Sequence, residues 1–250
     1  AKVIVYASSV GPYAPVAVER AEARVDESHP TTGIASSVYS VQKSEVERLL
    51  DAFEPAHPEI AIARMRPGLM FKSQAAAEIR RLFAGPFFPN AVLRRKVPVV
   101  PLPAGLRMQC VHTDDSARAF ALALAKRARG AFNIAAEPQL GPAELAAALG
   151  GRPAEVDPRV LRAAAQASWR ARLQPTPAGW LDMGMGVPAM DTTRAREELG
   201  WEPRVSATDA LSELIEGLAH GEGANTPPLD PEAGGRFRMR ELRTGIGARP

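Results

Sequence analysis

The stretch that decides the fold is residues 3–9, which read VIVYASS and form an apolar run that ends on two serines. The apolar residues are continuous rather than alternating, which is typical of a parallel strand buried on both faces. Residues 36–53 then place apolar side chains at helical spacing, and residues 60–65 form a second apolar run. This order predicts a strand–helix–strand unit with a right-handed crossover, so the expected fold class is α/β.

The helix predicted for residues 36–53 has a polar side in the sequence pattern. Its apolar positions keep close to helical spacing, which leaves Glu45, Glu47 and Arg48 on the other face. We therefore expect these three side chains to face solvent. Pro55 follows, and because proline lacks the amide hydrogen that a helix needs, we expect the helix to stop there.

The composition argues against several kinds of partner and against a disulfide or a metal site. The 250 residues are 46% hydrophobic, and their 31 basic and 28 acidic residues are spread along the chain, so we expect no nucleic-acid partner. No apolar run is long enough to span a membrane, and the N-terminus lacks a signal-peptide pattern, so we expect no membrane partner. Cys110 is the single cysteine, and no Cys/His cluster has metal spacing. We therefore expect no disulfide, no metal site and a cytoplasmic location.

One pair of side chains in the predicted helix can carry chemistry. Tyr39 precedes Lys43 by four residues, so a phenol and an ammonium group share one helical face, and the positive charge stabilises the phenolate. The first strand delivers Ser8 and Ser9 at its carboxyl end, where open α/β sheets place their ligands, and either hydroxyl can hold a substrate oxygen. The alternative is a tyrosine packed on a helix beside a surface lysine.

These features resemble the extended short-chain dehydrogenase/reductase family of NAD(P)-dependent epimerases, dehydratases and reductases. The segment from Ser8 to Tyr13 is similar to the family's serine motif, in which the active serine lies four residues before an aromatic, and this selects Ser9 over Ser8. Tyr39 and Lys43 match the family's tyrosine and lysine. The matching motifs further along the chain are Arg66-Pro67-Gly68, His112-Thr113-Asp114-Asp115 and residues 191–203.

The resemblance implies a fold, a cofactor and roles for particular residues. It implies an NAD(P) cofactor, a small-molecule substrate and possible homodimers, with the 36–53 helix as one candidate for the helices that pair. Catalysis would fall to Ser9, Tyr39 and Lys43, with the cofactor bound by Tyr39, Lys43, Arg66, Pro67 and Gly68. We expect residues 1–135 to be the C-terminal part of a Rossmann-type dinucleotide-binding domain with an excursion at 71–106, residues 136–221 a mainly helical substrate lobe, and residues 222–250 a disordered tail.

One part of the family pattern is missing. No strand, glycine-rich loop and helix precede the serine strand, and the chain begins with Ala1 rather than Met, so we expect an N-terminally truncated chain. Residues 184–189 and 245–247 contain closely spaced glycines, but neither follows a predicted strand, and we expect both to be turns. The expected function is an NAD(P)-dependent epimerase, dehydratase or reductase that acts on a hydroxyl or carbonyl carbon. The alternative is a non-catalytic binding or regulatory module derived from the same fold.

Overall fold

The computed structural model describes residues 1–17, 23–84, 93–94, 97–226 and 229–232. They belong to two compact units, and each unit is assembled from separate parts of the chain. The first unit comprises Ala1–Met70, Arg107–Leu140 and Asp182–Ala207, and the second comprises Phe71–Leu106, Gly141–Leu181 and Thr208–Pro250. This grouping differs from the division expected from sequence, because residues 71–106 join the second unit and residues 182–207 return to the first.

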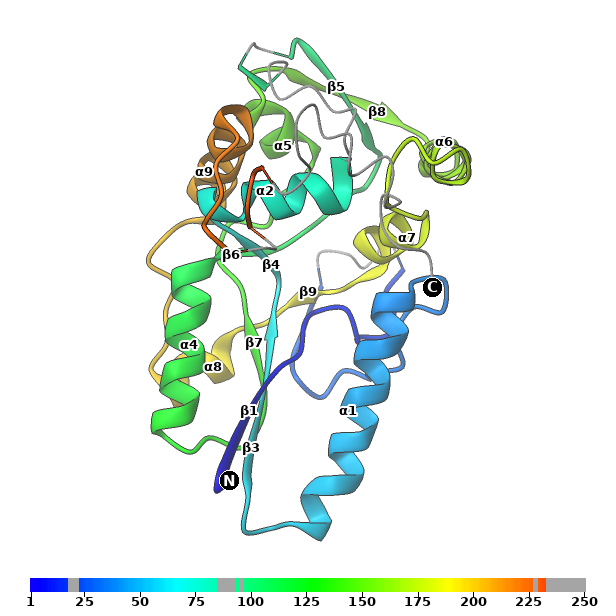
Figure 1. Cartoon of the computed structure of the whole chain (residues 1–250). Helices are drawn as coiled ribbons and strands as arrows, with labels where there is room; N and C mark the ends of the chain where they lie inside the picture. Colours follow the sequence, from blue (N-terminus) through cyan, green and yellow to red (C-terminus); the bar gives the residue numbers. More distant parts are fainter. Residues whose placement is uncertain (18–22, 85–92, 95–96, 227–228, 233–250) are drawn as a thin grey trace. The chain divides into compact units, whose positions relative to one another are not determined.

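A parallel sheet forms the centre of the first unit (Figure 1). Its strands are β1 (Val3–Ala7), β3 (Ala61–Pro67) and β7 (Gly130–Ile134), in the order β1-β3-β7. Val3 is in register with Ala61, and Ala63 with Gly130. Strand β3 is buried along its whole length. Strand β1 is only partly buried and lies at the edge of the sheet, so the expectation that it is buried on both faces is wrong for the part of the chain that the structure describes.

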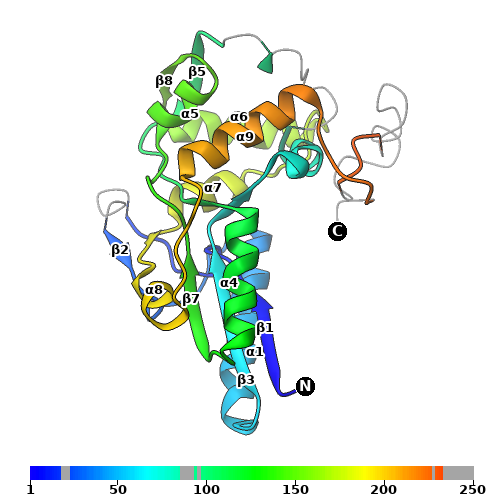
Figure 2. The same cartoon turned by 90° about the vertical axis from the view of Figure 1, so that its left-hand side faces the viewer.

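Two helices flank this sheet on opposite sides, α1 (Val38–Ala56) and α4 (Thr113–Ala125), as Figures 1 and 2 show. Ser37 caps α1 by accepting a hydrogen bond from the amide of Ser40 at 3.3 Å. Pro55 lies inside the last turn, so α1 ends slightly later than expected. His112 caps α4, since its Nδ1 accepts from the amide of Asp114 at 3.2 Å.

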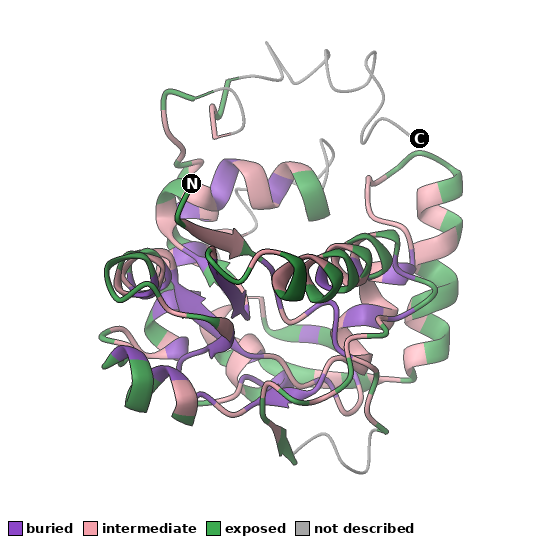
Figure 3. Ribbon diagram, turned by 90° about the horizontal axis from the view of Figure 1, so that it is seen from below, coloured by how far each residue is buried: buried purple, intermediate pink, exposed green. Residues whose placement is uncertain are grey.

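The apolar core of the first unit lies between the sheet, α4 and α8 (Thr193–Leu199). Trp201 is fully buried there, and its indole nitrogen donates to the carbonyl oxygen of Asp115 at 2.8 Å. Gly200 ends α8 with φ of 64°, a left-handed conformation that glycine adopts readily. In Figure 3 the buried residues gather along the strands, while the helices also carry exposed residues. The other core side chains come from β3, β6 (Cys110–His112), β7, α4 and α8: Ala63, Met65, Val111, Ala119, Ala123, Phe132, Ile134, Ala195 and Leu199.

The expectation that Glu47 faces solvent is wrong, because its side chain is fully buried. Several apolar side chains of α1 are exposed instead, with 62% of Val38 and 57% of Leu49 accessible. The reason is that the side of α1 facing the sheet meets Arg64 and Arg66 of β3, which need a carboxylate partner. Polar complementarity with the sheet has therefore overridden the apolar periodicity of this helix.

Two short pairs of strands complete the first unit. Strand β2 (Arg24–Val25) pairs in parallel with β9 (Ala189–Met190), and β4 (Leu69–Phe71) pairs with β6 (Cys110–His112). Cys110 is buried, and burial raises the pKa of its thiol to about 12, so this cysteine behaves as a small apolar core residue.

The second unit contains a pair of strands that the sequence does not reveal. Strand β5 (Val99–Pro103) pairs in parallel with β8 (Arg152–Val156), although both contain prolines. Prolines are tolerated here because each strand of a two-stranded sheet keeps an open edge that needs no amide donor. The helical elements of this unit are η2 (Ser73–Ala75), α2 (Ala76–Ile79), a π-helical turn (Arg80–Ala84), α5 (Pro142–Ala148), α6 (Pro158–Arg170) and α9 (Ala207–His220), and α7 (Gly179–Gly186) leads back to the first unit.

The tail expected at residues 222–250 lies largely outside the described residues. Within the described ranges, none of the helices combines the length and the apolar character that a membrane span requires.

Candidate active site

The three predicted catalytic residues lie at the carboxyl end of β1 and the start of α1, both in the first unit. Lys43 donates from Nζ to the carbonyl oxygen of Ala7 at 2.6 Å. Its Nζ lies 5.7 Å from the centroid of the Tyr39 ring and 5.1 Å from that of Tyr6. The ammonium group is therefore held between two aromatic rings, close enough to both for an electrostatic attraction.

Burial shifts the ionisation of the groups around Lys43. Burial lowers the pKa of the Lys43 ammonium, and the negative charge of Glu47 offsets only part of that effect. Burial also raises the pKa of Tyr6, with smaller contributions from Glu47 and Tyr39. Tyr6 is therefore a neutral ring against which the lysine packs, rather than a second base.

Gly11 lies between Ser9 and the ring of Tyr39. Its amide donates to Oγ of Ser9 at 2.7 Å, and its carbonyl oxygen accepts from Oγ of Ser40 at 2.5 Å. A Cβ atom at this glycine would lie 3.0 Å from Oγ of Ser9 and 3.0 Å from Cε1 of Tyr39. Ser9 and the ring of Tyr39 thus flank the same small space, and only a residue without a side chain leaves that space open.

Beside this space lies a buried network that the sequence analysis did not find, centred on the carboxylate of Glu47. Oε1 accepts from Oγ of Ser8 at 2.6 Å and from Nε of Arg66 at 3.0 Å. Oε2 accepts from Nη2 of Arg66 at 2.8 Å and from Nη1 of Arg64 at 3.2 Å. Burial alone raises the pKa of Glu47, but the hydrogen bonds and charge of Arg66, together with the hydrogen bonds from Ser8 and Arg64, lower it overall. A signal was available, because Tyr39, Lys43 and Glu47 follow one another at intervals of four residues.

The network continues from Arg66 to the next strand. Nη1 of Arg66 donates to the hydroxyl of Tyr13 at 3.0 Å, and that hydroxyl donates to Oδ1 of Asn133 at 2.6 Å. Tyr13 and Asn133 are fully buried, and burial raises the pKa of Tyr13 to about 12. The aromatic that marks the serine motif is therefore a neutral structural phenol.

The structure gives different positions to the residues expected to bind a cofactor. The guanidinium of Arg66 is committed to Glu47 and Tyr13, so its side chain is not available to a ligand. Pro67 accepts from the amide of Val10 at 2.9 Å, and the amide of Gly68 donates to Ile134 at 3.0 Å. A Cβ at Gly68 would lie 2.4 Å from the carbonyl oxygen of Gln109, so this glycine is required by close backbone packing.

The two serines of the motif have different partners. Ser8 donates its hydroxyl hydrogen to Glu47, whereas Ser9 accepts at its oxygen from Gly11. Because a hydroxyl both accepts and donates, Ser9 keeps its own hydrogen for another acceptor. This difference favours Ser9 over Ser8 as the group that contacts a substrate oxygen.

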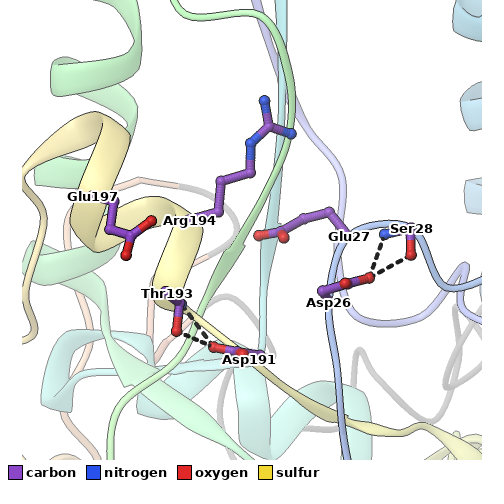
Figure 4. A pocket seen from close by; sticks show the side chains of 7 residues that line it. All are labelled: Asp26, Glu27, Ser28, Asp191, Thr193, Arg194 and Glu197. Atoms are coloured by element: carbon purple, nitrogen blue, oxygen red, sulfur yellow. Dashed lines mark hydrogen bonds between the residues drawn. The ribbon is translucent and has the colours of Figure 1, made fainter.

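A separate cavity of about 430 Å³ lies beside Glu27 and the start of α8 (Figure 4). Its carboxylates are held by neighbouring groups: Oδ1 of Asp26 accepts from Ser28, and Oδ1 of Asp191 accepts from Thr193. Oε1 of Glu27 accepts from the amide of Asn133 at 2.7 Å. Among the residues that the structure describes, no group of His, Cys, Asp and Glu side chains is arranged to hold a metal ion. The residues lining this cavity are Asp26, Glu27, Ser28, Asp191, Thr193, Arg194 and Glu197.

Gly184 and Gly186 do not form a phosphate-binding loop. Gly184 and Gly186 lie in α7, so the expected turn is the end of a helix. Residues 245–247 lie outside the described residues. Gly184 and Gly186 therefore provide no loop between a strand and a helix, which is the arrangement that places amide groups around a pyrophosphate.

Comparison with known proteins gives a family match and related folds. Residues 1–135 match the NAD dependent epimerase/dehydratase family. Uncharacterised proteins of Mycobacterium tuberculosis and Mycobacterium bovis are 26% identical over 190 residues, which cover 75% of this chain and 46% of each relative. The chain thus spans about half the length of these curated relatives.

Solved structures resemble the chain over most of its length. The UDP-glucose 4-epimerase of Thermus thermophilus, solved with NAD, has a TM-score of 0.58 at 17% sequence identity. The match covers 87% of this chain and 64% of the epimerase. The dTDP-glucose 4,6-dehydratase of Bacillus anthracis has a TM-score of 0.57 at 16% identity, and 88% of this chain covers 62% of it. These similarities confirm the predicted Rossmann-type α/β fold.

Proposed function

Because the chain belongs to the NAD-dependent epimerase/dehydratase family, we propose that the protein containing it is an NAD(P)-dependent epimerase, dehydratase or reductase. Its substrate would be a small molecule that reacts at a hydroxyl or carbonyl carbon. The observation that carries this proposal is the arrangement of Ser9 and Tyr39 around Gly11, with the ammonium of Lys43 beside the tyrosine ring. Family membership alone does not select the reaction, whereas this arrangement provides a base, a cation and a hydroxyl donor at one place.

The nicotinamide end of the cofactor fits the residues present, and the pyrophosphate end does not. Gly11 leaves a space without a side chain between Ser9 and Tyr39, and Lys43 lies beside it. By contrast, the candidate glycines near Gly184 lie in a helix. We propose that the phosphate-binding loop lies outside the residues that the structure describes. Activity is accordingly to be measured on the full-length protein that contains this chain.

Each side chain has a distinct task in the proposed reaction. The bound nicotinamide supplies the acceptor or donor of hydride. The phenolate of Tyr39 removes the proton from a substrate hydroxyl, or the phenol returns it in the opposite direction. Lys43 stabilises the phenolate through its positive charge, and its bond to Ala7 fixes its position. Ser9 donates its free hydroxyl hydrogen to the substrate oxygen, where negative charge develops.

A substrate panel tests the proposal. The full-length protein is incubated with NAD⁺ or NADP⁺ and with UDP-glucose, UDP-N-acetylglucosamine, dTDP-glucose or small alcohols, and products are identified by NMR. We expect turnover of at least one compound, and Ser9→Ala should lower kcat by roughly 10² to 10³, as loss of one hydrogen-bond donor to a developing oxyanion does. Absence of both turnover and calorimetric NAD(H) binding would instead support the non-catalytic module.

A methyl group at Gly11 should disturb the same space. In Gly11→Ala the new Cβ would lie 3.0 Å from both Ser9 and the Tyr39 ring, so one of them must move. Because small displacements of catalytic groups can cost about 10²-fold, we expect kcat/KM to fall by a factor of that order. The matched control is Gly184→Ala, where a Cβ meets no atom within 4 Å, and its kcat/KM should stay at the wild-type value. Equal activity of the two variants would contradict the assigned site.

A further inference from the structure

We propose that Glu47, paired with Arg66, is a positioning residue that holds the serine segment, residues 8–13, against the helix carrying Tyr39 and Lys43. The inference rests on the proposed function, since it concerns the placement of Ser9. It adds a charged pair to the site that neither the sequence motifs nor the comparisons assign. The pair bonds to Ser8 and Tyr13, at the two ends of the serine segment, so its proposed role is to set geometry.

The serine segment needs contacts from other elements to hold its position because it has no regular secondary structure of its own. It leaves the sheet at the end of β1 and runs beside α1, so its position depends on individual hydrogen bonds. Residues of α1 supply several of them. Ser40 donates to Gly11 at 2.5 Å, Ser44 donates to Pro12 at 3.2 Å, and Glu47 accepts from Ser8 at 2.6 Å. These three residues lie along one face of the helix, so the serine segment is hydrogen-bonded to α1 along most of its length.

The ion pair fixes both ends of the segment at once. At one end, Ser8 donates to the carboxylate of Glu47. At the other end, the hydroxyl of Tyr13 accepts from Arg66 at 3.0 Å, and its ring lies 4.9 Å from the guanidinium carbon. Arg66 itself holds Glu47 through two nearly parallel hydrogen bonds of 3.0 and 2.8 Å. Such a two-point contact fixes the orientation of the two side chains as well as their distance. Ser9 and Gly11 therefore lie between Ser8 and Tyr13, which are both held by the same ion pair.

The chemistry of the pair suits this task better than an apolar contact would. Ser8 and Tyr13 are buried hydroxyl groups, and each needs a partner because burying an unpaired polar group is costly. A carboxylate serves the serine as acceptor, and a guanidinium serves the tyrosine as donor. A buried ion pair often gives little net stability compared with apolar side chains, so a positional role accounts for it better than a stabilising one.

Ser8→Ala tests the inference with the ion pair left intact. The variant removes one anchor but leaves the bonds between Glu47 and Arg66 in place. We expect amide hydrogen exchange in the peptide spanning residues 8–13 to rise about tenfold, as loss of one buried hydrogen bond implies. Turnover should fall by a similar factor, mainly in kcat. The melting temperature should move by no more than about 4 °C, so the effect is not general unfolding.

Two further variants make the result specific. Ser8→Thr keeps the hydroxyl and should restore both exchange protection and kcat. Ser212→Ala removes a hydroxyl that bonds within α9, to Thr208 at 2.9 Å, and should change neither. Unchanged exchange in Ser8→Ala would overturn the inference whatever the activity. Raised exchange in a protein whose wild type shows no turnover would uphold the anchoring and refute the proposed function instead.

Discussion

Replacing Tyr39 by Phe is expected to lower kcat of the full-length protein by a factor of about 10² to 10⁴, the usual contribution of general acid–base catalysis. The substitution removes only the hydroxyl oxygen. The ring that lies 5.7 Å from Nζ of Lys43 remains, and so does the bond from Lys43 to Ala7. The effect therefore isolates proton transfer from the packing of the site. It is measured as steady-state turnover with the substrate found in the panel.

Two controls accompany this measurement. The Tyr39→Phe variant should still bind NADH and unfold at a similar temperature, because the ring and the bond from Lys43 to Ala7 are both retained. A kcat within a factor of two or three of the wild-type value would remove Tyr39 from the mechanism. The assignment of Lys43 would fall with it, since the lysine acts through the phenolate.

Replacing Glu47 by Gln is expected to lower the free energy of unfolding by about 3–5 kcal/mol, the range found when one member of a buried ion pair is removed. The cost arises mainly at Arg66, which is buried and loses its carboxylate partner. Arg64 keeps Asp51 and Glu54, so it remains paired. Urea denaturation followed by tryptophan fluorescence measures the difference.

The effect of Glu47 should also depend on pH. The pKa of Glu47 is lowered in the folded protein, so its stabilising contribution is present above the ordinary carboxyl pKa of about 4.3 and is lost as pH falls through the folded-state value. The difference between the wild type and Glu47→Gln should shrink on acidification in that range. A difference that stays constant down to acid unfolding would show that the charge of Glu47 is not responsible.

Glu45→Gln is the matched control on the same helix. Glu45 pairs with Arg48 at 2.7 Å, and both side chains are exposed to solvent. Exposed pairs at this spacing contribute no more than about 0.5 kcal/mol, so this variant should unfold almost as the wild type does. Equal losses from Glu45→Gln and Glu47→Gln would contradict the buried position of Glu47.

The strands and helices of the first unit were largely predictable because their patterns are local. Apolar runs predicted β1 and β3, and helical spacing predicted α1 between them. The orientation of α1 was not predictable in the same way. Periodicity alone assigns the apolar side to the core, and Glu47 violates that rule because its partners, Arg64 and Arg66, are supplied by a strand distant in sequence.

In the second unit, two strands could not be predicted from the local sequence. Prolines in β5 and β8 argued against strands, and only the pairing of these two distant segments makes strands of them. In the candidate site, spacing predicted the pair Tyr39 and Lys43, and the resemblance to the family's serine motif selected Ser9; these three assignments stay predictions. Gly11, Tyr13 and Asn133 were not assigned roles, because their importance depends on which atoms they contact in space.

The most direct test of the proposed catalytic role of Tyr39 is a single-turnover measurement of nicotinamide absorbance. The full-length protein containing this chain is mixed with NAD⁺ and UDP-glucose, or with another substrate that the panel identifies. We predict that reduced nicotinamide forms in the wild type and that its rate of formation falls by at least about 10² in Tyr39→Phe. Formation of reduced nicotinamide at equal rates in both proteins would contradict the assigned site, and a wild type that binds no NAD(H) would contradict the proposed function.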